Sequence, residues 1–178
     1  MVKETHIKGG HIFALLALPF INSKFLNGYD LVYKLILISI YIYFSYLGSL
    51  FPDIDMRSSY VSKRYPILYK KIGSKFKHRG FTHSLIFISF LCYIFDLLVK
   101  FSDNNIVFLC LSNGFIIGYI SHLCLDIITK EGIQVFYPIC IKFSLLPIKT
   151  SSKCEKIICK ALNFAFIFLL GYRFYILF

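Results

Sequence analysis

Five long apolar runs dominate this sequence of 178 residues and leave few folds open to it. They cover residues 11–22, 35–51, 84–99, 106–128 and 157–178. A membrane-spanning helix needs roughly 17–25 residues, so the second, fourth and fifth runs are long enough, the third is marginal and the first is short. Pro19, near the end of the first run, favours a segment that only dips into the bilayer. We therefore expect an all-α fold, a multi-span membrane helical bundle with four to five apolar helices.

The composition and the connections agree with one membrane-embedded unit. Hydrophobic residues make up 57% of the chain, compared with roughly 45–50% in an ordinary soluble domain. No linker, repeat or low-complexity tract divides the sequence, so residues 1–178 are predicted to form a single domain. No small-x-small cleavage pattern follows Phe20, which argues against a signal peptide. The six cysteines form no CxxC pair and are expected to be reduced packing residues.

Basic residues concentrate in two of the connections between apolar runs. Residues 52–83 carry eight Lys and Arg residues against two aspartates, and residues 129–156 carry five lysines against two glutamates. The positive-inside rule assigns both connections to the cytoplasm. Connections separated by a pair of spans must lie on the same side of a membrane, so the two assignments agree. The sequence thus predicts a multi-pass membrane protein with two basic cytoplasmic loops.

A few histidines and carboxylates stand at the edges of the apolar runs, where this topology brings them to one depth. They are His11, Asp53, Asp55, His78, His83, His122 and Asp126. Ionisable side chains at membrane depth are costly and mark functional sites, and imidazole and carboxylate groups hold zinc and similar divalent ions. The pattern predicts a metal site near the cytoplasmic boundary. His6 lies in the polar stretch before the first run, and we expect it to be solvated.

Local spacing supports this site and leaves an alternative open for each pair. His122 and Asp126 are four residues apart and share one helix face, so both can reach one ion, or Asp126 only orients His122. Asp53 and Asp55 follow Pro52, which ends a helix. An extended backbone points both carboxylates the same way, which favours a bound cation, although a helix cap is the alternative.

The densest polar stretch is residues 78–84, with the sequence HRGFTHS, directly before an apolar run. Arg79 offers a planar, permanently charged fork that suits a phosphate or carboxylate. Its alternative role is to anchor the basic loop on the cytoplasmic side. Thr82 or Ser84 is suited to cap the helix that follows.

Three strings of this sequence resemble one known family: GSLFPDIDMRSS, HRGFTHS and GYISHLCLDIITKEGIQVFYP. They are similar to the bacterial inner-membrane-associated, metal-dependent hydrolases that are described as LexA-binding, and the resemblance runs from His11 to about Ile158. Many relatives have a histidine after the PDID string, where this chain has Met56. That family is similar, more distantly, to the zinc-dependent phospholipase C group of helical enzymes.

The resemblance implies a bacterial inner-membrane protein that hydrolyses a phosphoester or ester with a divalent metal, zinc being the expected ion. The ligand set that it implies is His11, Asp53, Asp55, His83, His122 and Asp126. Asp55, if it is not a ligand, is the expected general base, Arg79 would hold an anionic group, and His78 is a ligand or a substrate contact. Because the site lies at the lipid–water boundary, a lipid-borne phosphoester is the natural substrate.

Other function classes fit parts of the sequence. A non-catalytic regulatory or docking protein would keep a structural metal and use its basic loop to bind a protein or anionic lipid headgroups. A transporter would need polar residues that track across the bilayer, which the apolar runs lack. No helix-turn-helix or zinc-finger spacing accompanies the net charge of +11. We therefore expect no specific nucleic-acid partner, and membrane lipids or a protein as partners.

Overall fold

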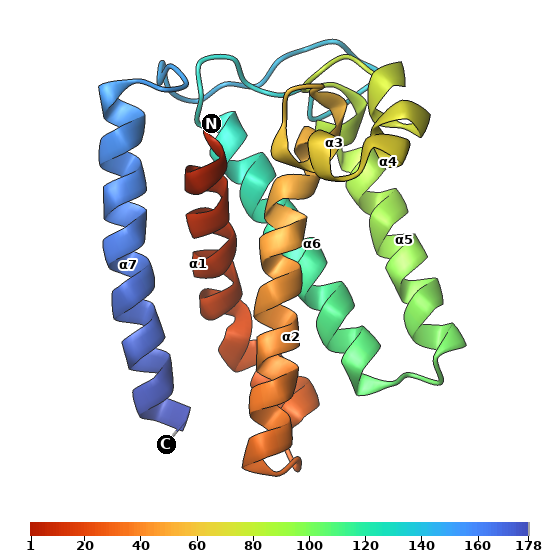
Figure 1. Ribbon diagram of the computed structural model, residues 1–178, viewed down its shortest axis with the longest axis vertical. Helices are drawn as coiled ribbons and strands as arrows, with labels where there is room; N and C mark the ends of the chain where they lie inside the picture. The colour runs from red at the N-terminus through yellow and green to blue at the C-terminus, as the bar shows by residue number, and fades with distance from the viewer. Residues whose placement is uncertain (178) are drawn as a thin grey trace.

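The computed structural model describes residues 1–177, and within them the regular structure is helical. Five long helices connect the two ends of the molecule (Figure 1): α1 (Lys3–Ile21), α2 (Leu31–Leu50), α5 (Leu85–Phe101), α6 (Ile106–Ile127) and α7 (Lys153–Leu177). Phe178, the last residue of the fifth apolar run, lies outside the described residues. The predicted all-α fold is confirmed.

Four of the long helices meet the length and apolarity that a membrane span requires. The four candidate spans are Lys3–Leu26, Leu31–Asp55, Ile106–Ile127 and Lys153–Ile176. α5 has 17 residues and is the shortest of the five, at the lower limit for crossing a hydrocarbon core. Four to five apolar helices were expected, and the structure agrees.

The first helix is longer than the sequence predicts. It begins at Lys3 rather than at His11, so the polar residues before the apolar run are helical. Pro19 does not end it, because the chain continues through a π-helical turn, η1 (Asn22–Leu26). Such wider turns adjust the helix where a regular hydrogen bond is missing. The helical stretch is therefore long enough to span rather than to dip.

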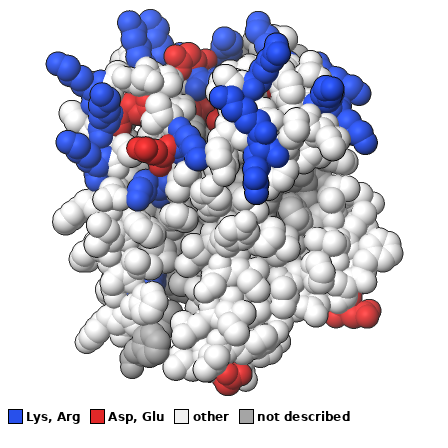
Figure 2. Space-filling view, in the orientation of Figure 1, with Lys and Arg blue, Asp and Glu red and all other residues white. Residues whose placement is uncertain are grey.

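The first basic connection folds into short helical turns that cover one end of the bundle. These turns are η2 (Phe51–Asp55), α3 (Tyr60–Arg64), α4 (Pro66–Lys71), η3 (Gly73–Lys75) and η4 (Phe81–His83). The second basic connection, 129–152, contains two isolated bridges, Thr129 with Ile148 and Ile133 with Phe143. Both connections lie at the end where the chain begins (Figure 1), and Lys and Arg gather over that end (Figure 2). We call it the basic end.

Short polar side chains fix where the helices begin. Asp30 accepts a hydrogen bond from the Tyr33 amide at the start of α2, and Asn105 accepts one from the Val107 amide at the start of α6. Ser84 does the same for α5. Of the two cap candidates before α5, Ser84 is thus the cap, and Thr82 is free for another contact.

α2 and α6 pack most closely, through small residues. At Gly114 and Gly118, one turn apart on α6, a Cβ atom would overlap the backbone carbonyls of Tyr41 and Ser45 on α2. Small residues at this spacing let two helix backbones approach in a membrane. This contact fixes how far α2 and α6 are shifted along their axes relative to each other. It therefore also fixes the relative positions of the polar residues at the basic ends of the two helices.

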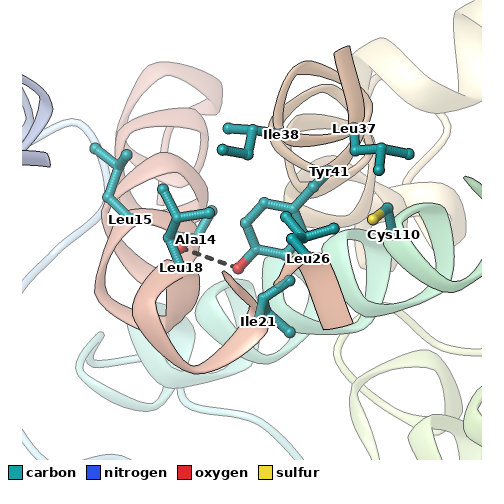
Figure 3. Packing of buried hydrophobic residues seen from close by; sticks show 9 residues of the cluster. All are labelled: Ala14, Leu15, Leu18, Ile21, Leu26, Leu37, Ile38, Tyr41 and Cys110. Atoms are coloured by element: carbon teal, nitrogen blue, oxygen red, sulfur yellow. Dashed lines mark hydrogen bonds between the residues drawn. The ribbon is translucent and has the colours of Figure 1, made fainter. Parts of the chain in front are cut away.

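The largest cluster of buried hydrophobic residues joins α1 to this pair (Figure 3). Tyr41 is fully buried there, and its hydroxyl donates a hydrogen bond to the carbonyl of Ala14 at 2.9 Å. The buried members of the cluster are Ala14, Leu15, Leu18, Ile21, Leu26, Leu37, Ile38, Tyr41 and Cys110. Since α1 is fixed against α2 and α6, its first turn reaches the basic end beside their polar residues.

Candidate metal centre

Histidine and aspartate side chains from four stretches of the chain meet at the basic end. α1 supplies His6, η2 supplies two aspartates, residues 78–83 supply two histidines, and α6 supplies one of each. Three overlapping groups have their ligand atoms within 4.8 Å of one another: His6, Asp53 and His122; His83, His122 and Asp126; and Asp53, Asp55 and His78. Histidine and carboxylate sets of this kind hold zinc and related divalent ions.

Asp126 lies at the middle of the cluster, and its side chain is buried. Its Oδ2 atom is 3.6 Å from Nε2 of His122 and 3.7 Å from Nε2 of His83. Its Oδ1 atom is 3.4 Å from Nε2 of His6 and 2.8 Å from the amino group of Met1. Three imidazole nitrogens thus surround one carboxylate.

Four of these atoms are buried without a hydrogen-bond partner among the described residues: Nε2 of His6, His83 and His122, and Oδ2 of Asp126. A buried polar atom left unpaired costs about 1–3 kcal/mol. Nδ1 of His122 lies 2.7 Å from the carbonyl oxygen of Ser49, which can only accept, so Nδ1 carries the proton. The Nε2 lone pair of His122 therefore points into the cluster, as in a metal-binding histidine.

The stacking of two histidine rings makes it unfavourable to satisfy the unpaired atoms of the cluster by protonating the histidines alone. The rings of His6 and His122 stack with their centroids 3.7 Å apart and their planes 9° apart. Two imidazolium ions at this separation would repel each other strongly in a buried site. A divalent cation held by one of these groups would satisfy unpaired imidazole nitrogens together with a carboxylate, so the residues present fit a metal.

Asp55 is engaged by protein donors on both carboxylate oxygens. Nδ1 of His78 lies 2.7 Å from Oδ1, and Oδ2 accepts from the Arg79 amide at 3.0 Å and the Thr82 hydroxyl at 2.5 Å. Nδ1 of His83 lies 3.3 Å from the same Oδ2. Asp55 therefore holds the 78–83 stretch together and orients His83, whose Nε2 faces Asp126.

Asp53 has the opposite surroundings. Its side chain is 17% exposed, and its Oδ1 lies 3.7 Å from Nε2 of His122. It also lines a cavity of about 310 Å³, which we call the head cavity. Asp53 is therefore the carboxylate of the cluster that a molecule from outside can reach.

Arg79 links the cluster to the second basic connection. Its guanidinium lies 3.3 Å from Oδ2 of Asp126 and 3.1 Å from both Glu131 and Thr129. Partial burial opposes the charge on Glu131, but hydrogen bonds from Thr150 and Arg79 and the nearby positive charge hold the pKa of Glu131 below its usual range. The guanidinium that was expected to hold an anionic group thus already neutralises two carboxylates of the protein.

His11 does not belong to the cluster, and His6 takes the place expected for it. The His11 ring packs 5.2 Å from Phe166 and 6.4 Å from Tyr46, between centroids. On a helix, five residues correspond to about 140° of rotation and about 7.5 Å of rise, so the two histidines cannot reach the same point. The expectation that His6 is solvated is wrong, because this side chain is fully buried.

The sequence does contain a signal for His6. Gly9 and Gly10 follow it by three and four residues, so they share its face of the helix. Gly9 faces Leu125 of α6 and Gly10 faces Ser49 of α2, and neither leaves room for a Cβ atom. Paired glycines on one face mark it as a contact surface, and His6 lies on that surface.

Comparisons with known proteins place these features in a family. A family model described as YdjM inner membrane protein matches residues 1–178. The uncharacterized protein YvsG of Bacillus subtilis strain 168 is 38% identical over 133 residues, which are 74% of this chain and 76% of that protein. The inner membrane proteins YdjM of Escherichia coli strain K12 and Shigella flexneri are each 34% identical over 118 residues, 65% of this chain and 59% of those proteins.

The match therefore spans less than two thirds of the length of the two YdjM proteins. Neither LexA nor a phospholipase C appears in the descriptions of these relatives. No solved structure matches the chain.

Proposed function

The chain belongs to the YdjM inner membrane protein family, and we propose that it is a membrane-bound, metal-dependent hydrolase that acts on a phosphoester or an ester. An inner-membrane location follows from the family and from the apolar helices. The observation that carries the proposal is the set of buried, mutually facing ligand atoms without hydrogen-bond partners among residues 1–177. The metal and the reaction are both part of the proposal.

Five residues would hold the metal in this proposal: His6, Asp53, His83, His122 and Asp126. Three imidazoles with two carboxylates suit zinc better than magnesium, which prefers oxygen ligands alone. The set differs from the one that the resemblance implies at two positions. His6 replaces His11, and Asp55 is not counted as a ligand because it contacts Nδ1 of His83 and orients that ring.

A zinc-type ion, when bound there, supplies Lewis-acid polarisation of a substrate oxygen and lowers the pKa of its water towards about 7. His78 is the nearby group suited to proton transfer, because its side chain is 35% exposed and its Nδ1 lies 2.7 Å from Asp55. Asp55 fixes the ring and leaves Nε2 of His78 to hold or release a proton. We therefore assign the general acid–base role to His78 rather than to Asp55. Arg79 offsets the charge of Asp126.

We place this centre at the cytoplasmic face of the membrane. Most of the Lys and Arg side chains visible in Figure 2 gather over the end of the molecule that contains the cluster. Cytoplasmic segments of inner-membrane proteins carry such an excess of positive charge. The same basic surface favours a second candidate function, a docking protein whose metal is structural and whose partner is a protein or anionic lipid headgroups.

Hydrolysis of a soluble substrate separates the two functions. Detergent-purified protein loaded with zinc or manganese is expected to hydrolyse bis(p-nitrophenyl) phosphate, and the His122→Ala variant to lose about a hundredfold or more in kcat/KM. His11→Ala is the matched control, since it removes a histidine of α1 outside the cluster, and it should retain the activity. A folded, metal-loaded wild type that hydrolyses neither this phosphodiester nor p-nitrophenyl acetate would favour the docking protein.

A further inference from the structure

The head cavity is the open side of the candidate centre. Apart from Asp53, its polar lining includes Lys3, Ser58, Ser59 and Thr150. The ammonium group of Lys3 lies 3.4 Å from the centre of the Tyr60 ring, which also lines this cavity. Lys3 supplies a positive charge and Ser58 a hydroxyl group that suit a small anionic group such as a phosphate, whereas the hydroxyls of Ser59 and Thr150 already donate to Ser62 and Glu131.

A second, apolar cavity adjoins the head cavity. It has a volume of about 410 Å³ and is lined by four tyrosines, by apolar residues that include Leu47, Phe51 and Leu68, and by Arg64. We call it the tyrosine cavity. The two cavities share the lining residues Leu50, Tyr60 and Val61, so they lie next to each other at the basic end of α2.

The tyrosine cavity lies where a bilayer surface is expected. Ile67 on α4 is 70% exposed, and Tyr65 beside it is also exposed, whereas Lys70 and Lys71 follow on the same short helix. Exposed apolar and aromatic side chains next to lysines are typical of segments at the lipid–water interface. A lipid in the adjacent leaflet can reach the tyrosine cavity without crossing water.

From this arrangement we propose that the substrate is an amphiphile with an anionic phosphoester head and an apolar chain, taken from the surrounding leaflet. The inference rests on the proposed hydrolase and names its substrate class. The head lies in the head cavity against Asp53 and Lys3, and the chain lies in the tyrosine cavity. The junction at Leu50, Tyr60 and Val61 is where the head meets the chain. A water-soluble phosphoester would leave the tyrosine cavity unused.

Tryptophan fluorescence tests this proposal directly, because the chain contains no tryptophan. Tyr43 lines the tyrosine cavity and is 57% exposed, so Tyr43→Trp introduces a reporter at little structural cost. Ile36→Trp is the control, because residue 36 is also exposed and lies two turns away on nearly the same face of α2, outside the cavity. The probe is decyl phosphate brominated at its chain end, added to zinc-loaded protein in nanodiscs of unbrominated lipid.

We expect quenching to saturate in Tyr43→Trp at about a tenfold lower probe concentration than in Ile36→Trp, and to weaken about tenfold when zinc is removed by a chelator. Equal quenching at both positions would mean that the probe only partitions into the bilayer, which overturns the proposal. Quenching that is specific to Tyr43→Trp but independent of zinc would also overturn it, since the chain would then bind without the centre.

The hydrolase proposal is judged separately in the same preparations. Turnover of bis(p-nitrophenyl) phosphate without preferential quenching of Tyr43→Trp would support the hydrolase proposal and contradict the proposal of an amphiphilic substrate. As a further control on the chain, Leu68→Trp fills the tyrosine cavity and Ile67→Trp, its neighbour on α4, does not. Decyl phosphate should inhibit the turnover of bis(p-nitrophenyl) phosphate less strongly in Leu68→Trp than in Ile67→Trp. Methyl phosphate should inhibit the turnover equally in both variants.

Discussion

Asp53 and Asp55 are separated by one residue, yet their side chains meet opposite surroundings. Asp55 is buried and accepts hydrogen bonds on both oxygens, whereas Asp53 borders the head cavity and faces His122. The backbone there is the 3₁₀ turn η2 and not the expected extended segment, and it gives the two carboxylates different partners although an oxygen of each lies within 4.8 Å of the other. One aspartate is thus available to a metal and the other supports the fold.

Replacing each of these aspartates by asparagine should separate the two roles. Asp55→Asn leaves buried donors around residue 55 poorly matched, so it should lower the metal-free stability by about 1–3 kcal/mol. Asp53→Asn should leave that stability nearly unchanged and weaken zinc binding instead. Thermal unfolding with chelator present and zinc competition titrations measure the two effects. The reverse pattern, with stability lost only in Asp53→Asn, would contradict these assignments.

Most of the candidate ligands could be predicted from the sequence, and one of them, His6, could not. His122 and Asp126 follow from helical spacing, and the PDID and HRGFTHS strings mark the two turns that meet them. His6 was missed because its polar neighbours in sequence look like a solvated tail. Burial of that stretch depends on α1 packing between α2, α6 and α7, which no local pattern of the first ten residues specifies.

At the scale of helices, the position of the cluster depends on how closely α2 approaches α6. Gly118→Ala places a Cβ against the carbonyl of Ser45, so it should destabilise the protein by about 1–3 kcal/mol and weaken metal binding as the helix ends move apart. Gly171→Ala on α7 meets open space and should be neutral or stabilising by up to about 1 kcal/mol. Thermal unfolding in detergent compares them, and equal stabilities would contradict the packing account.

The long helices could be predicted from apolar run length, while the short ones could not. α3 and α4 have five and six residues, too few for a periodic pattern. They form because Ser59 caps α3 through the Ser62 amide and Pro66 suits the first turn of α4. Their sequence is basic and partly apolar, which indicated a loop. Their contribution to the tyrosine cavity therefore emerges only from the folded chain.

At the scale of the whole molecule, the protein surface has an apolar part and a basic part. The long helices expose apolar side chains, above all on α7, and most of the Lys and Arg side chains visible in Figure 2 lie at the basic end. The candidate centre lies where these surfaces meet, with His6, His83, His122 and Asp126 buried below the basic end. In the proposed arrangement, the membrane covers the cluster from one side, and the head cavity beside Asp53 gives access to it.

The metal content of the purified protein tests the central claim most directly. Elemental mass spectrometry on detergent-purified wild type, His6→Ala, His11→Ala and His122→Ala compares proteins that all remain helical by circular dichroism. We predict bound zinc or a similar divalent metal in wild type and His11→Ala, and its loss in His6→Ala and His122→Ala. A folded wild type that holds no metal after reconstitution with zinc, manganese or iron, or a His6→Ala variant that keeps its full metal content, would contradict the account.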